Sequence, residues 1–150
     1  MILRLASAFA LIAAATTLYF SRTANFFEIE KTVTVEASTE KIYALISNLE
    51  NWKKWSEFSK ENLGIVEIVS KIPEKELLVN LNYTTPIQQK LRYSFYTHSL
   101  GLNKSELKIV CKGDLDLMKK VIHKIFNVNR LIEEQLSQEI DHIKKIAEYK

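Results

Sequence analysis

The amino-acid sequence predicts an α+β fold in which an antiparallel sheet of about five strands packs against a long C-terminal helix. Apolar and polar residues alternate with period two in several segments before residue 113, and an apolar stripe with helical spacing runs along the last third of the chain. With 150 residues, of which 47% are hydrophobic and 26% charged, the chain is long enough for one domain to bury one core. We expect an N-terminal hydrophobic helix to precede this domain.

The N-terminal segment from Leu5 to Ser21 is a run of 17 uncharged residues between Arg4 and Arg22. As a helix it would be about 26 Å long, slightly shorter than the ~30 Å hydrocarbon core of a bilayer. We therefore expect residues 1–24 to form a single-pass membrane anchor and linker, and residues 25–150 to form a domain outside the cytoplasm. Two alternatives stay open. The small residues Ala13–Ala15 fit a signal-peptidase site, which would give a secreted or periplasmic protein, and the segment also fits an ordinary packed helix.

The first strand and a short helix are predicted directly after the linker. One side of the strand carries Phe27, Ile29, Lys31, Val33 and Val35, which alternate with polar residues. Ser38 is placed to cap a helix whose apolar residues recur at helical spacing: Ile42, Leu45, Ile46 and Leu49. This helix continues toward Trp52 and Trp55, which are three residues apart and therefore share one face.

Four further strands are expected between turn-forming residues, at residues 65–72, 77–84, 87–97 and 106–112. Pro73–Lys75, Thr84–Pro86 and the loop from Ser99 to Lys104 separate them. Alternation within the last three strands places one row of side chains on the same face of the sheet: Leu77, Val79, Leu81, Tyr83, Leu91, Tyr93, Phe95, Leu107, Ile109 and Cys111. This row predicts the apolar side of the sheet.

The last third of the chain reads as one long amphipathic helix with a break near Asn127 or Asn129. Its apolar stripe has an average spacing of about 3.6 residues and consists of Leu117, Val121, Ile125, Val128, Ile132, Leu136, Ile140, Ile143 and Ile146. A stripe of this length needs a matching apolar surface, and the row on the sheet supplies it.

Composition argues against several classes of function. The net charge of +3 falls to +1 without Arg4 and Arg22, because the first 24 residues hold no acid, so no nucleic-acid partner is expected. Cys111 is the single cysteine and the three histidines are scattered, so no spacing of metal ligands occurs. We expect no metal, no cofactor and no catalytic residue. Cys111 lies in the apolar row, which favours a buried inert thiol.

The stretch from Val33 to Phe58, VTVEASTEKIYALISNLENWKKWSEF, resembles the opening of polyketide-cyclase-like members of the SRPBCC (START-like) superfamily. Two tryptophans at this spacing directly after the helix carry the likeness. The later strand region from Ile68 to Pro86 and the closing helix from Leu136 to Glu148 are also similar to the family. The resemblance implies a helix-grip fold, in which a curved sheet wraps the C-terminal helix. It also implies one departure, because the passage from Phe58 to Gly64 is too short for an edge hairpin that relatives carry there.

The resemblance implies a membrane-tethered, monomeric binding module for a hydrophobic small molecule or lipid, with a cavity between sheet and helix. The residues expected to line the cavity are Trp55, Leu81, Tyr83, Tyr93, Phe95, Ile109, Cys111, Ile122 and Phe126. A polyketide cyclase- or dehydratase-like enzyme is one alternative, although the inward rows offer only tyrosine hydroxyls and a thiol. A structural or interaction domain with a filled core is the other, and in it Trp52 and Trp55 would pin the short helix onto the core.

Overall fold

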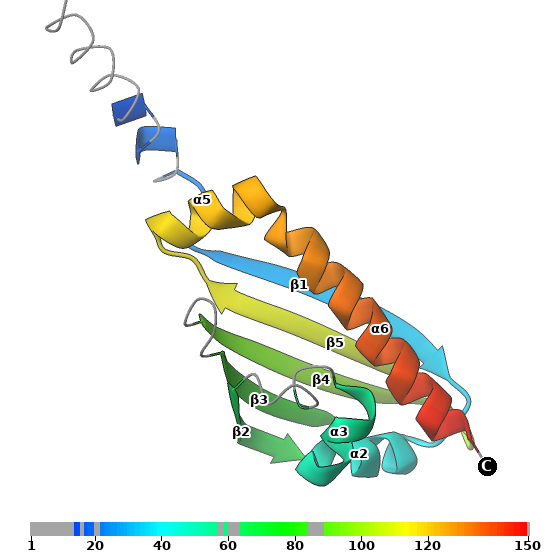
Figure 1. The fold of residues 1–150 in the computed structure, drawn as a ribbon. Coiled ribbons are helices and arrows are strands. Elements are labelled where there is room, and N and C mark those ends of the chain that lie inside the picture. The colour runs from blue at the N-terminus through cyan, green and yellow to red at the C-terminus, as the bar shows by residue number, and fades with distance from the viewer. Residues whose placement is uncertain are drawn as a thin grey trace, which may run out of the picture.

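The computed structural model describes residues 14–15, 17–19, 22–56, 59, 64–83 and 89–149. Within these residues, five strands form one antiparallel sheet in the order β1-β5-β4-β3-β2, so the first strand lies beside the last. The strands are β1 (Phe26–Val35), β2 (Gly64–Ile72), β3 (Glu76–Tyr83), β4 (Gln89–Gly101) and β5 (Lys104–Asp114). The helices are α2 (Thr39–Ser47), the 3-10 turn η1 (Leu49–Asn51), α3 (Trp52–Trp55), α5 (Leu117–Phe126) and α6 (Val128–Glu148). Figure 1 shows α6 lying across one face of the sheet.

The inner face of the sheet carries the predicted apolar row. Alternation in β5 leaves every second residue from Leu107 to Cys111 fully buried, and the register pairs Tyr93 with Cys111 and Phe95 with Ile109 across β4 and β5. Tyr83 ends β3, but its side chain lies outside the described part of the structure. The prediction of an antiparallel sheet with one apolar face is confirmed, because period two places successive side chains on opposite faces.

The short helices close one end of the core. Lys41 N donates to Ser38 Oγ at 3.3 Å, so Ser38 is the predicted N-cap of α2. Trp52 and Trp55 are both buried, their ring centroids are 4.6 Å apart, and Trp52 Nε1 donates to Ile46 O at 2.7 Å. The predicted shared face of the two tryptophans is confirmed, and that face is turned into the core.

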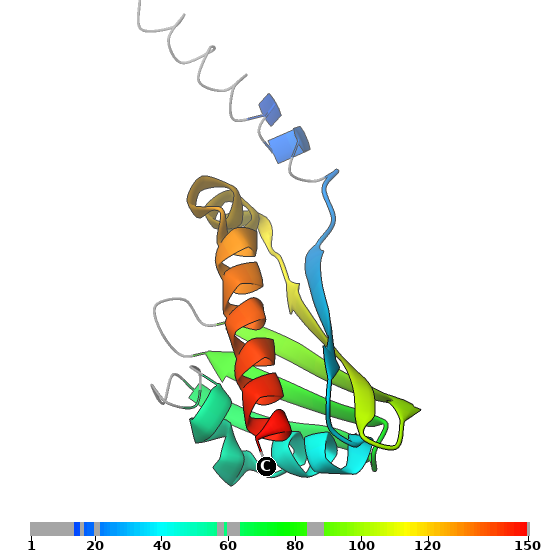
Figure 2. The same cartoon turned by 90° about the vertical axis from the view of Figure 1, so that its right-hand side faces the viewer.

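The C-terminal helix is broken at Asn127, as predicted, but only its second part covers the sheet. Asn127 has left-handed backbone angles (φ 49°, ψ 46°), which end α5 and start α6 in a new direction. In α6 the residues Leu136, Ile140 and Ile143 are buried. In α5, Ile125 is 68% exposed, so the prediction that one continuous stripe docks on the sheet is wrong for this helix. Figure 2 shows α5 beyond the end of α6, on the side where the N-terminal segment enters the domain.

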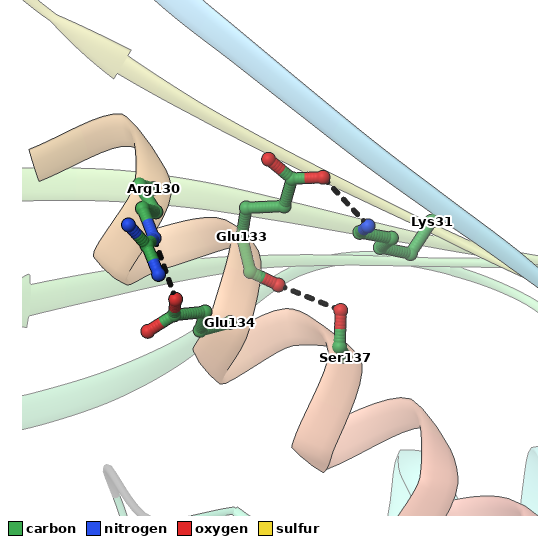
Figure 3. A network of polar contacts seen from close by, with 5 residues as sticks. All are labelled: Lys31, Arg130, Glu133, Glu134 and Ser137. Carbon is green, nitrogen blue, oxygen red and sulfur yellow. Dashed lines mark hydrogen bonds and ion pairs between the residues drawn. The ribbon is translucent and has the colours of Figure 1, made fainter. Parts of the chain in front are cut away.

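Polar contacts hold α6 along β1. Lys31 Nζ lies 2.7 Å from Glu133 Oε1, as drawn in Figure 3, and Lys144 Nζ donates to Thr34 O at 2.6 Å. Near the C-terminal end of α6, Glu36 N donates to Glu148 Oε1 at 2.8 Å. These contacts fix the line of α6 over β1, and this line determines which α6 side chains enter the interior.

The predicted membrane anchor needs correction. Of the segment from Leu5 to Ser21, only residues 14, 15 and 17–19 belong to the described part, and the Ala13–Ala15 site lies partly outside it. Among the residues that the structure describes, no helix combines the length and the apolar character needed to cross a membrane. The expectation of a single-pass anchor with the domain outside the cytoplasm is therefore not supported.

Candidate ligand-binding site

Six of the nine predicted cavity residues lie together in the interior between the sheet and α6. Each is at most 2% exposed, and all belong to one buried cluster: Trp55, Leu81, Tyr93, Phe95, Ile109 and Cys111. They come from α3 and from strands β3, β4 and β5. The side chains from the strands face inward as alternation within strands predicts, and their role as the lining of a ligand cavity stays a prediction.

Ile122 and Phe126 do not join this wall. Both belong to α5, where Ile122 is half-buried and Phe126 is 66% exposed. The left-handed turn at Asn127 separates α5 from the docked helix, so the helical stripe on which the prediction relied does not continue across it. Tyr93 and Phe95, which were predicted to line one cavity together with Ile122 and Phe126, lie in the buried core cluster without them.

Aromatic rings form one side of the interior. The Trp55 and Phe95 rings meet edge to face, with centroids 5.9 Å apart at an interplanar angle of 78°. Trp52 contacts the same phenylalanine at 5.8 Å, and Tyr93 lies 6.1 Å from it. Such edge-to-face contacts fix ring positions as well as burying area. Phe95 of β4 is therefore the centre of a rigid aromatic wall.

The indole N–H groups of Trp52 and Trp55 differ in their hydrogen bonding. Trp52 Nε1 donates to a backbone carbonyl of α2. Trp55 is 0% exposed, and its Nε1 is a buried atom without a hydrogen-bond partner in the described structure. Buried donors of this kind are uncommon in native proteins and call for an explanation.

Glu139 is a candidate functional residue that the sequence reasoning missed. It is 1% exposed and reaches the interior from α6, where its Oε1 accepts from Ser56 Oγ at 2.9 Å and from Gln135 Nε2 at 3.4 Å. The position could have been found, because residue 139 stands three after Leu136 and four before Ile143 and so lies on the buried side of α6. A buried carboxyl group is expensive, so its position is a candidate for function.

Cys111 is a buried thiol that stays protonated. Burial, and secondly the Glu139 carboxylate, raise the pKa of Cys111 from its ordinary value of 9.0 to about 12, while a hydrogen bond with Tyr93 acts in the opposite direction. A thiol with this pKa carries almost no thiolate at neutral pH and is not a nucleophile. The predicted inert thiol at this position agrees with its environment.

His142 supports Trp55 from α6. Its Nδ1 lies 3.3 Å from Trp55 O, and since a carbonyl oxygen accepts, the imidazole donates. Ser56 N donates to Trp52 O at 2.7 Å, which completes the turn of α3. Trp55 and Ser56 are thus held from both sides, by α6 and by their own helix.

Comparisons with known proteins place the fold. No protein-family model matches the chain, and no curated protein matches it. Among solved structures, the Zhui aromatase/cyclase from Streptomyces sp. R1128 superposes with a TM-score of 0.54 at 10% identity, over 82% of this chain and 94% of that one. Protein MLL2253 from Mesorhizobium loti superposes with a TM-score of 0.58 at 9% identity, over 79% of this chain and 95% of that one. The di-domain ARO/CYC StfQ from the steffimycin biosynthetic pathway superposes with a TM-score of 0.51 at 8% identity, over 82% of this chain and 51% of that one.

The chain shares its fold with these solved structures. The sheet of five strands with its C-terminal helix agrees with the helix-grip architecture that the Val33–Phe58 stretch implied. At identities of about a tenth, this likeness concerns the fold alone, because one fold carries many functions. Function has to be argued from the interior itself.

Proposed function

We propose that this chain is a binding module for an apolar small molecule or lipid, held between the sheet and helices α3 and α6. The observation that carries the proposal is the aromatic wall around Phe95 together with two buried polar groups, the Trp55 N–H and the Glu139 carboxylate. Mostly apolar walls with a few placed polar groups are the usual form of a small-molecule site. Two of the structural neighbours are aromatase/cyclases, and this is consistent with an interior of this kind.

The proposed entry lies at the β2 edge of the sheet. The hairpin expected to be missing before Gly64 would have covered this edge, and β2 is outermost in the described sheet. Val66 and Ile68 of β2 are half-buried against the core. An apolar ligand that enters there meets apolar side chains before it reaches Phe95.

A cyclase-like enzyme is the second candidate, and Glu139 is the observation that favours it. Acid–base chemistry needs a group whose pKa lies near the working pH. The neighbouring thiol of Cys111 has a pKa of about 12 and is therefore no second proton carrier at neutral pH. Binding without chemistry is the function that the described residues support best.

The test uses two tyrosines of β4 that face opposite sides of the sheet. Tyr93 is 2% exposed in the interior, and Tyr96 is 40% exposed on the other face. If the interior holds a ligand, the parent takes up a fluorescent naphthalene probe, Tyr93→Trp abolishes uptake at an unchanged melting temperature, and Tyr96→Trp changes neither. If the interior is filled, Tyr93→Trp costs about 1–3 kcal/mol by overpacking. A parent that takes up no probe, together with a destabilised Tyr93→Trp variant, would overturn the proposal in favour of a structural domain.

A further inference from the structure

The indole N–H of Trp55 is a buried donor for which the described part of the chain supplies no partner. Trp55 is fully buried, so bulk water does not reach this group, and the described part of the chain offers it no acceptor. Trp52 provides the contrast on the same helix, since its N–H is satisfied by Ile46 O at 2.7 Å. Native folds rarely leave a buried donor without an acceptor. A site that receives a ligand is one explanation for such a donor.

The direction of this N–H is fixed before any ligand arrives. His142 holds the carbonyl of Trp55, and the ring rests edge to face on Phe95 at 5.9 Å. The next residue, Ser56, is 1% exposed and donates to Glu139 of α6 at 2.9 Å. A donor held by its own backbone, a neighbouring ring and a second helix loses little freedom on binding. Most of the free energy of one hydrogen bond to it therefore contributes to the affinity of the ligand.

The interior also disfavours a second negative charge. Glu139 is 1% exposed and accepts from Ser56 Oγ at 2.9 Å, so an acidic group already lies in this interior. In a medium of low polarity, repulsion between two anions is far stronger than in water. A ligand that brings a carboxylate would meet this repulsion, whereas a neutral oxygen would not.

We propose that the ligand is a neutral apolar molecule with a hydrogen-bond-accepting oxygen, of the ketone or ether class, and that this oxygen accepts from the indole N–H of Trp55. The inference rests on the proposed binding function and narrows it. Apolar contact with the aromatic wall supplies most of the attraction, and Trp55 selects for the oxygen. Free fatty acids and other carboxylates are disfavoured, because a buried unpaired charge is costly and Glu139 already places one acidic group in this interior.

The test compares three probes of nearly equal size: 2-ethylnaphthalene, 2-acetylnaphthalene and 2-naphthoate. The parent should bind the acetyl compound about tenfold more tightly than the ethyl compound, since one buried donor becomes satisfied. It should bind 2-naphthoate at least about tenfold more weakly than the ketone. Trp55→Phe keeps a ring and removes the N–H, so it should bind the ethyl and acetyl compounds equally. Trp52 belongs to the aromatic wall, so the control variant Trp52→Phe should change the affinity for both compounds alike, but it should keep the preference because the Trp52 N–H already has a partner.

A second measurement does not depend on the stability of a variant. The chain has two tryptophans, so nitrogen-15 labelling gives two indole signals, which Trp52→Phe assigns. The Trp55 signal should move with 2-acetylnaphthalene and stay in place with 2-ethylnaphthalene. Equal affinities of the parent for both compounds, or an unmoved Trp55 signal, would overturn the inference while the binding function stands. A parent that binds none of the three probes would instead overturn the binding function.

Discussion

Alkaline pH should destabilise this protein through Cys111, and the size of the effect follows from its burial. In the folded state the pKa of Cys111 is raised to about 12, first by burial and then by Glu139, whereas in the unfolded chain it has its ordinary value of 9.0. Between these values the unfolded state has lost the thiol proton and the folded state keeps it. The folded state then binds more protons, so the free energy of unfolding falls as pH rises. The full contribution is present below about pH 9 and is lost on the way to about pH 12.

The expected slope is about 1.4 kcal/mol per pH unit, which amounts to about 2 kcal/mol between about pH 9 and 10.5. Urea unfolding of the parent and of Cys111→Ala measures it. The variant leaves a small void and is less stable at neutral pH, but it has no thiol to titrate. The difference in unfolding free energy between the two proteins should therefore shrink as pH rises. The contributions of titrating tyrosines and lysines cancel in this difference because both proteins contain these residues.

Alkylation gives an independent check on the same thiol. At pH 8 a thiol with a pKa of 9.0 is about one-tenth thiolate, and one with a pKa of about 12 is thiolate in about 1 molecule in 10,000. Labelling of the folded parent by iodoacetamide should accordingly be slower by about a thousandfold than in urea. Labelling at the rate of an unfolded thiol, or a stability difference that stays constant with pH, would show that Cys111 is not held in the buried, carboxylate-facing position.

Three further predictions test the core and the helix break. Leu136→Ala should lower the free energy of unfolding by about 2–5 kcal/mol because its side chain is fully buried, whereas Leu131→Ala, at a site 57% exposed on the same helix, should change it by less than about 0.5 kcal/mol in thermal melts. Gly113→Ala should cost about 1–3 kcal/mol because the added Cβ would clash with the ring of Phe27, while Gly101→Ala meets no described atom within 4 Å; equal melting temperatures would contradict this. Asn127→Ala should lose about 1 kcal/mol because its φ is 49°, and Asn127→Gly should lose nothing, as judged by urea midpoints.

The parts of the fold that the sequence predicted are those set by local rules. Period two determined which residues of β3, β4 and β5 face inward, and the buried Tyr93 and Phe95 lie where alternation placed them. Ser38 caps α2 because a serine directly before a helical apolar pattern satisfies a free backbone N–H. Neither feature depends on the rest of the chain, so the sequence alone was enough to predict them.

The predictions that were wrong depend on the direction of the C-terminal helix in space. A stripe of apolar residues predicts one docked face only while the helix continues, and the left-handed Asn127 turns α5 away from the sheet, leaving Phe126 66% exposed. The sequence indicated the break but not the new direction. The direction follows from contacts between distant residues, first the burial of Leu136, Ile140 and Ile143 in the core. The exposed ion pair of Lys31 with Glu133 at 2.7 Å also links α6 to β1 (Figure 3).

Glu139 connects the helix to the tryptophan motif. Counting only apolar residues along α6 leaves out this acid, although its spacing from Leu136 and Ile143 puts it on the buried side. A carboxyl group there is tolerated only with hydrogen-bond donors, and Ser56, directly after Trp55, supplies one at 2.9 Å. The motif thus brings an aromatic ring, an N–H and a hydroxyl to the same part of the interior that receives the carboxyl group from α6. A filled structural core has no need of such a polar pair, since apolar residues of equal volume would pack there at lower cost, and this is the physical reason for proposing that the interior binds a ligand.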